Sequence, residues 1–408
     1  MMPFWEKLRD VLPLRGVGKA PKEEKAVRTE LDESTRAWLT LKLTPELGNI
    51  SVLKLVKRFG SAEAVCGARA EAAQMPGLRR EARESLAAGR TIRPVEDEWR
   101  DLRHRGWGLI CLGDPDYPNN LENIADPPAV LYATSAPEPR DLVAVAVVGS
   151  RSASPMGLIF TERLCADLAR RGVTVVSGFA LGIDSAAHRG AIRAGGRTLA
   201  VLGCGLDVLY PRPNADLRAA VMAHGGFFTE FPLGTPPLSG HFPQRNRIIS
   251  GLALGVVVVE ATAKSGSLIT ARSALEQGRE VFAVPGTAGN LRSLGPHLLL
   301  RQGAALVESA DDILEHLKPL IRPSRTTPSA VPPAAAAAAP EPNQSPAGHD
   351  LSPEETAVLD ILGQEPVHVD RLCAQTGLGA AAVTAALSAL EIKGLVRQMP
   401  GKYFMRLL

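Results

Sequence analysis

Residues 142–157 read Leu-Val-Ala-Val-Ala-Val-Val-Gly-Ser-Arg-Ser-Ala-Ser-Pro-Met-Gly, an apolar run followed by a turn of small residues. The unbroken apolar run predicts a strand buried on both faces, and Pro155 favours a helix that starts directly after the turn. Backbone N–H groups, hydroxyls and a helix N-terminus then gather at one place, which suits a phosphate. Arg151 adds a guanidinium that can clamp a phosphate through two hydrogen bonds. The stretch therefore predicts an α/β fold with a phosphate-binding turn at a strand end.

The residues around this stretch repeat the alternation of apolar strands with amphipathic helices. This order predicts an α/β domain over residues 101–320, with a parallel sheet covered on both faces. Ligands of such sheets collect at the carboxyl ends of the strands, so the turns at those ends should lie close together. The expected strands are Leu142–Val148, Val173–Ser177, Thr198–Leu202, Phe227–Glu230, Val256–Glu260 and Val281–Val284.

The regions that flank the α/β domain differ from it in composition. We expect a loosely held leader over residues 1–30 and a helical domain over 31–100, where apolar residues recur at three- and four-residue spacing. Residues 321–350 are rich in proline and alanine and predict a linker. Residues 351–408 show the pattern of a winged helix. Its three helices are expected at Pro353–Leu362, Val369–Thr376 and Gly379–Lys393, and its hairpin at Leu395–Met405, turning at Pro400-Gly401.

The composition limits the kinds of partner and compartment. Of the 408 residues, 45% are hydrophobic and 22% are charged, and the net charge is only +3, so a nucleic-acid site must be a local patch. The five cysteines lie far apart without a C-x-x-C pair, which favours reduced thiols in a cytoplasmic protein. We recognise neither a signal core nor a membrane-spanning run, and we expect no contact with a membrane.

A second strand end, Ser-Gly-Phe-Ala-Leu-Gly-Ile-Asp at residues 177–184, should lie beside the first turn. Asp184 and His188 stand one helical turn apart and are conceivable as an acid–base pair. A carboxylate that caps a helix and a histidine that packs or bonds locally are the more ordinary interpretation. We favour that interpretation and expect no catalysis from the pair.

Two further strand ends carry positive charge. Residues 241–247, His-Phe-Pro-Gln-Arg-Asn-Arg, combine an aromatic ring with two arginines, which suits a single strand whose phosphates meet arginines and whose base stacks on the ring. Positive charge at a helix start is unfavourable unless a ligand compensates for it. Residues 264–267, Lys-Ser-Gly-Ser, place hydroxyls and a lysine at another helix N-terminus. Any one of these turns is compatible with an ordinary strand-to-helix connection, but four together predict a phosphate-binding rim.

Motifs of cofactor enzymes are missing from the sequence. We find no G-x-G-x-x-G of a dinucleotide site, no Gly-Lys-Ser/Thr of a P-loop, no H-E-x-x-H, no G-x-S-x-G and no clustered metal ligands. We therefore expect no cofactor, no metal ion and no catalytic residue.

Taken together, the four blocks resemble the DNA-processing protein A (DprA/Smf) family. The similarity lies in Gly-Ser-Arg…Ser…Gly from Gly149, the block that starts at Ser177, Phe-Pro-x-Arg-Asn-Arg-Ile-Ile from Phe242, and Ser-Gly-Ser-Leu-Ile-Thr-Ala from Ser265. These blocks occur in this order within about Trp107–Leu317. His297 departs from the family, which usually carries asparagine there. The resemblance implies an extended Rossmann-like domain, flanked by a SAM-like helical domain and a winged helix.

The resemblance also implies a function. It implies binding of single-stranded DNA, a homodimer, and a recombination mediator that protects incoming strands and loads the RecA recombinase during natural transformation. On this interpretation the protein is not an enzyme. The matching positions and the strand ends above give the expected DNA-binding residues: Gly149, Ser150, Arg151, Ser154, Gly157, Ser177, Gly178, Phe242, Arg245, Asn246, Arg247, Lys264, Ser265, Gly266 and Ser267.

Two other classes of function stay open from the residues. A Rossmann-type nucleotide hydrolase acting on nucleoside monophosphates could seat a 5′-phosphate on the same turn, with Glu230 and Glu260 as conceivable acids. The Pro-Gly-Gly-x-Gly-Thr stretch of such enzymes is truncated here to Pro285-Gly286-Thr287. A transcription regulator could act through the winged helix, but Gly379–Lys393 carries almost no polar side chain that could read bases.

Overall fold

The computed structural model describes residues 28, 30–320, 351–362, 367–393, 395–399 and 403–406. The chain divides into two compact units, Met1–Thr326 and Thr327–Leu408. The predicted linker lies outside the described residues, as does the predicted leader apart from Arg28 and Glu30.

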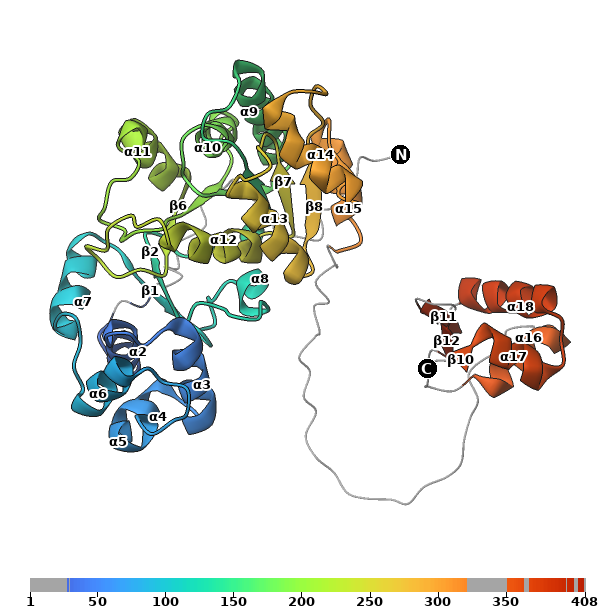
Figure 1. The fold of residues 1–408 in the computed structure, drawn as a ribbon, viewed down its shortest axis with the longest axis horizontal. Helices are drawn as coiled ribbons and strands as arrows, with labels where there is room; N and C mark the ends of the chain where they lie inside the picture. The colour runs from blue at the N-terminus through green and yellow to red at the C-terminus, as the bar shows by residue number, and fades with distance from the viewer. Residues whose placement is uncertain are drawn as a thin grey trace, which may run out of the picture. The chain divides into compact units, whose positions relative to one another are not determined.

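The first unit is built on a sheet of nine strands in the order β1-β2-β6-β5-β4-β3-β7-β8-β9 (Figure 1). All six predicted strands are confirmed, each with ends within two residues of the expected ones. The sheet is not purely parallel, however, because β1 and β2 pair antiparallel with each other and β2 pairs antiparallel with β6. The strands are β1 Gly108–Cys111, β2 Val130–Ala133, β3 Ala144–Val148, β4 Thr174–Ser177, β5 Thr198–Val201, β6 Gly225–Thr229, β7 Gly255–Val258, β8 Glu280–Ala283 and β9 Ala305–Leu306.

The order of the parallel strands reverses next to β3. The chain runs outward from β3 through β4, β5 and β6, and then returns to place β7 on the other side of β3, followed by β8 and β9. The β3–β7 register pairs Val145 with Gly255 and Val148 with Val258, so both strands end at the same level. Loops leave such a switch point in opposite directions, which opens a crevice at the carboxyl ends.

Helices cover both faces of this sheet, as predicted. One apolar core joins the sheet to α9, α10 and α15, and a second core joins the opposite face to α8, α12, α13 and α14. Since each buried apolar side chain stabilises the fold by about 1.5–3 kcal/mol, these two cores hold the strand ends in fixed positions. The helices are α8 Asn119–Glu122, α9 Pro155–Arg170, α10 Ile183–Arg193, α11 Ala215–His224, α12 His241–Leu252, α13 Ser267–Glu276, α14 Leu294–Arg301 and α15 Ala310–Leu317.

A helical region packs against the β1–β2 end of the sheet (Figure 1). Trp99 and Leu102 of this region share one apolar cluster with Tyr132 of β2 and Phe227 of β6. The predicted boundary between residues 31–100 and 101–320 falls inside its last helix, and it stays a prediction. The helices are α2 Glu33–Leu43, α3 Asn49–Phe59, α4 Ala62–Gly67, α5 Arg69–Ala72, α6 Arg80–Ala88 and α7 Val95–His104.

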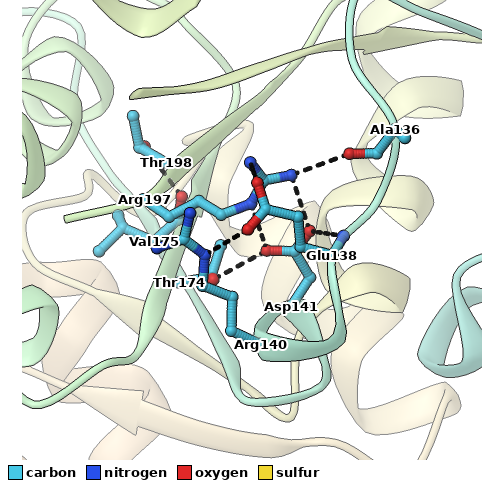
Figure 2. Close-up of polar contacts among 8 residues, drawn as sticks. All are labelled: Ala136, Glu138, Arg140, Asp141, Thr174, Val175, Arg197 and Thr198. Atoms are coloured by element: carbon cyan, nitrogen blue, oxygen red, sulfur yellow. Dashed lines mark hydrogen bonds and ion pairs between the residues drawn. The ribbon is translucent and has the colours of Figure 1, made fainter. Parts of the chain in front are cut away.

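The amino ends of the central strands are tied by a buried arginine, shown in Figure 2. The Arg197 side chain, only 5% exposed, donates to the carboxylates of Asp141 and Glu138 and to the carbonyl of Ala136. Thr174 donates to the same Asp141 carboxylate at 2.9 Å. The charges of this network are paired with one another, so the network stabilises the amino edge of the sheet.

The second unit is a winged helix, which confirms the predicted helices and hairpin. Helix α18 carries Val383 and Leu387 into the apolar core, while Thr384, Ala385 and Ser388 are exposed. The predicted turn at Pro400-Gly401 lies outside the described residues. The elements are α16 Pro353–Ile361, β10 Val367–His368, α17 Val369–Thr376, α18 Ala380–Ile392, β11 Val396–Met399 and β12 Tyr403–Arg406, with the sheet order β10-β12-β11.

Candidate nucleic-acid interface

A crevice of about 490 Å³ lies at the carboxyl ends of the parallel strands, where the order of β3 and β7 reverses. The structure brings together here residues from all four sequence blocks; the block at 177–184 contributes Ala180 and Asp184, which are not among the predicted DNA-binding residues. The predicted residues that line the crevice are Gly149, Arg151, Phe242, Arg245, Asn246, Ser265, Gly266 and Ser267.

The crevice has a second wall that the sequence analysis did not include. Tyr210, from the loop after β5, lines it beside Phe242, and the two ring centres are 5.7 Å apart. Pro237 and Ser239 of the loop between β6 and α12 complete this wall. The sequence signal that could have identified Tyr210 is an aromatic residue in the loop after the predicted strand Thr198–Leu202.

A smaller cavity of about 110 Å³ adjoins the crevice and shares Arg151, Tyr210 and Phe242 with it. Gly178, also predicted as a DNA contact, lines this smaller cavity. The two aromatic rings therefore border both cavities, and the guanidinium groups of Arg151 and Arg245 lie 5.3 and 5.9 Å from the centre of the Phe242 ring.

Arg151 is the exposed cation of the site. Its guanidinium carbon lies 5.3 Å from the centre of the Phe242 ring. Within the described part of the chain, its side chain makes no hydrogen bond or ion pair, and it is exposed to solvent. An arginine held over an aromatic ring without a carboxylate partner keeps its donors available to an incoming anion.

Arg245 has a different environment from the one expected. It is 4% exposed, and it donates to the carbonyls of Gly178 (2.6 Å) and Val201 and to the Asn246 side chain. Burial lowers the pKa of Arg245 to about 10. Its guanidinium thus fixes the ends of β4 and β5 through Nε and Nη1, which already have protein partners, and contributes positive charge to the floor of the crevice.

The turn from Gly149 to Gly157 uses its polar groups mainly within the protein. The N–H of Ser150 donates to the carbonyl of Glu260 at 2.6 Å. The N–H and hydroxyl of Ser154 donate to the carboxylate of Glu260 at 2.8 and 2.5 Å, and the Ser154 hydroxyl accepts from the N–H of Gly157. The prediction of a helix start at Pro155 is confirmed, but a carboxylate of the protein already occupies that N-terminus.

The glycines of the strand ends are explained by two different constraints. A Cβ on Gly149 would lie 2.7 Å from the Ile183 side chain, and one on Gly178 would lie 2.7 Å from both Arg245 and Asp184. These glycines are therefore required by packing within the protein. Gly266 is exposed, and a Cβ there would meet no atom within 4 Å. Gly266 thus leaves open space in the crevice at the start of α13.

The N-terminus of α13 faces this open space. The Ser265 and Ser267 hydroxyls, which line the crevice, lie 2.8 Å apart. Gly266 is the N-cap residue and provides no side-chain cap; the Ser267 N–H makes a long, 3.4 Å hydrogen bond to the Ser265 hydroxyl, and the first turn of α13 carries no acidic residue to neutralise the positive end of the helix dipole. Asn246 holds the turn through a 3.3 Å hydrogen bond to the Gly266 carbonyl. Hydroxyls beside an uncapped helix start can bind a phosphate oxygen.

Seven predicted residues do not line the crevice, and one of them, Gly178, lines the smaller neighbouring cavity. Arg247 points elsewhere, because its guanidinium pairs with Asp126 (2.7 Å) and Glu230 (2.8 Å). Ser177 is fully buried and its hydroxyl donates to the Val147 carbonyl, so a ligand in the crevice cannot reach it. Lys264 is exposed on the loop that leads to α13. Ser150, Ser154 and Gly157 shape the turn that carries Arg151, as described above.

Asp184 and His188 form no acid–base pair. Asp184 accepts a 3.3 Å hydrogen bond from the Ala180 N–H, and burial raises its pKa while the charge of Arg245 partly opposes this. His188 bonds Thr198 at 2.7 Å, and burial lowers the pKa of His188 to about 3. Both residues are therefore parts of the buried support below the crevice. The expectation of a locally bonded histidine is confirmed. The expectation that Asp184 caps α10 is wrong, because the N-cap residue is Gly182 and Asp184 instead holds the preceding loop.

The carboxylates that a nucleotide hydrolase would need are engaged elsewhere. Glu230 pairs with Arg247 and Glu260 bonds Ser154, and neither residue lines the crevice. His297, the position that departs from the family, contacts the Gly286 carbonyl at 2.9 Å. Within the described ranges no group of three or more potential metal ligands occurs, and no helix is long and apolar enough to cross a bilayer.

Comparisons with known proteins match both units. Residues 108–318 match the family model of DNA recombination-mediator protein A, and residues 332–402 match the DprA winged helix domain. The chain is 41% identical to the Smf protein of Escherichia coli over 72% of this chain and 76% of that one. It is 33% identical to the Smf protein of Synechocystis over 90% and 98%. The crystal structure of DprA from Streptococcus pneumoniae matches with a TM-score of 0.60 and 34% identity, over 70% of this chain and 98% of that one.

Proposed function

The chain belongs to the DprA/Smf family of DNA recombination mediators, and on that premise we propose that its crevice binds single-stranded DNA. The observation that carries the proposal is Arg151, a cation without a protein partner among the described residues, placed over Phe242 at the sheet's switch point. The uncapped start of α13 lies across the same crevice.

The charges around the crevice favour a polyanion. Arg151 is exposed above it, Arg245 is buried in its floor, and Lys264 lies on the loop beside it. The carboxylate that lines the crevice belongs to Asp184, whose pKa is raised by burial. A chain of phosphates that crosses from Arg151 to Ser265 and Ser267 would meet one cation and one helix N-terminus in turn.

The aromatic residues favour a single strand over a duplex. Phe242 and Tyr210 are both partly exposed, and they lie at the junction of the two cavities. A flat ring can stack on a base only if the base is unpaired and free to leave its neighbours, which single strands permit. The affinity should therefore depend weakly on sequence and strongly on salt.

The wider role follows from family membership. We infer that the protein protects single strands and loads the RecA recombinase onto them, that it acts as a homodimer in the cytoplasm, and that it serves natural transformation. A strand-exchange assay with a competing single-strand binding protein tests the loading step. The expected result is recombinase activity that rises with this protein and does not rise with an Arg151→Ala variant.

The nucleotide hydrolase is a weaker candidate. It would need a carboxylate in the crevice that can reach a sugar, and both conceivable acids are engaged in the contacts described above. A transcription regulator also loses support, because the exposed positions of α18 include Ala380, Thr384, Ala385 and Ser388, which offer little to a base edge.

A binding titration tests the proposal. Fluorescence anisotropy of a labelled oligonucleotide, single-stranded or in a duplex, would be measured with the full chain, with Arg151→Ala and with Arg301→Ala. Arg301 is exposed at the end of α14 and serves as a matched loss of charge. We expect Arg151→Ala to weaken single-strand binding by about 1–3 kcal/mol and Arg301→Ala to change it little. Equal affinities for all three proteins would overturn the assignment.

A further inference from the structure

Glu260 contacts the Arg151 turn at two places. Its carbonyl accepts the N–H of Ser150, on one side of Arg151, at 2.6 Å. Its carboxylate accepts the N–H and the hydroxyl of Ser154, on the other side. Glu260 follows β7 and the turn follows β3, so these contacts join the two strands that flank the switch point.

The same carboxylate explains the last glycine of the turn. A Cβ on Gly157 would lie 2.7 Å from the Glu260 carboxylate, so only glycine allows the acid to come this close to the start of α9. Ser154 is the N-cap residue of α9, and its hydroxyl donates to the Glu260 carboxylate and accepts the Gly157 N–H at 3.0 Å. The carboxylate thus stands where an anion at the N-terminus of α9 would stand.

This placement separates two possible roles of a negative charge beside a DNA site. If Glu260 acted only through its charge, it would repel phosphate, and its neutralisation would strengthen binding. If it holds the turn, its removal would release Arg151 and weaken binding, because an ordered guanidinium loses less conformational entropy when it binds.

We propose that Glu260 is a positioning residue for DNA binding: it fixes the turn that presents Arg151 and closes the N-terminus of α9 to phosphate. This inference rests on the proposed function for its DNA part. The strand is then directed across Arg151 toward α13, whose N-terminus has no such acid. The acid that the sequence suggested for hydrolysis has a structural use instead.

The positioning itself can be measured without DNA. Amide hydrogen exchange of residues 149–157 would be compared in the full-length protein, in Glu260→Ala and Glu260→Gln, and in Ser154→Ala, which keeps the charge. Glu276→Gln, at the exposed end of α13, is the matched control for charge. We expect exchange to rise at least about tenfold in Glu260→Ala, less in Glu260→Gln and Ser154→Ala, and not in Glu276→Gln. Unchanged exchange in all the variants would overturn the proposal.

Single-strand affinity then tests the consequence. We expect Glu260→Ala to weaken binding about ten- to a hundredfold, and by less than about threefold when Arg151 is already alanine, since the two residues act through one contact. Glu260→Gln retains the side-chain volume and covers the case in which alanine prevents folding. Tighter binding by Glu260→Gln would overturn the positioning role. If the unaltered protein binds no single strand, the proposed function fails, while the exchange data still decide whether Glu260 holds the turn.

Discussion

Replacing Arg245 by alanine should mainly lower the free energy of unfolding of the protein, and this loss should exceed any loss of DNA-binding free energy from a direct contact. The substitution leaves the carbonyls of Gly178 and Val201 without this donor in the buried floor of the crevice. It also removes the positive charge that favours ionisation of the buried Asp184. Unpaired buried acceptors cost about 1–3 kcal/mol each, and loss of one member of a buried charged network costs about 3–5 kcal/mol. These two estimates overlap, so we expect about 3–5 kcal/mol of lost stability.

Urea unfolding followed by tryptophan fluorescence measures this loss. Trp38, Trp99 and Trp107 belong to the first unit and residues 327–408 contain no tryptophan, so the signal reports on the unit that contains Arg245. With a slope of about 3 kcal/mol per molar urea, the midpoint should fall by about 1 M or more. Arg151→Ala is the control, since an exposed side chain that makes no hydrogen bond or ion pair with the described residues should change stability by less than about 0.5 kcal/mol. If Arg245→Ala kept the midpoint and lost DNA binding, Arg245 would be a ligand contact, as the sequence suggested.

Four other substitutions test the remaining parts of the site. Gly266→Ala should fold normally, because its φ of −61° suits alanine and its Cβ would enter open space, yet it should weaken single-strand binding. Gly178→Ala should instead lower the urea midpoint, because its Cβ would lie 2.7 Å from Arg245 and Asp184. Comparable effects of the two glycine variants on stability would contradict this assignment. Phe242→Ala should cost about 1–3 kcal/mol of single-strand affinity and little duplex affinity, measured by anisotropy, and equal losses for both would refute stacking. The pKa of His188 is lowered from 6.5 to about 3, so the unfolded chain takes up this proton first and stability should fall as the pH drops below about 6.5, by up to about 1.4 kcal/mol per pH unit. The raised pKa of Asp184 has the opposite effect on stability as the pH falls. Urea midpoints at pH 7 and pH 5 should therefore be measured for the unaltered protein and for His188→Gln, which retains Asp184. The decrease in midpoint between pH 7 and pH 5 should be smaller in His188→Gln.

The sequence predicted the strands of the parallel sheet because their apolar runs are unbroken, as in Ala144–Val148, and because helices separate them. It did not predict β1 and β2, which lie in a region without a regular alternation of strands and helices. β2 joins the sheet by antiparallel pairing with β6, which is distant in the sequence, and no local pattern encodes that contact.

At the site, the sequence predicted which loops meet, but it could not predict which way each side chain points. Arg245 and Arg247 lie two residues apart on α12, and the helical repeat turns them to different surroundings, one below the crevice and one toward Asp126 and Glu230. Glu260 could be an acid or a structural anchor from the sequence alone. Its role became visible only when the fold placed its carboxylate beside Ser154.

The central claim is that single-stranded DNA lies across the carboxyl ends of the parallel strands. Amide hydrogen exchange of the full-length protein, with and without a saturating single-stranded oligonucleotide, tests it most directly. The account predicts protection of residues 149–153, 237–243 and 264–268, with little change at the Arg197 network on the amino edge. Protection confined to that amino edge or to the winged helix would contradict the account.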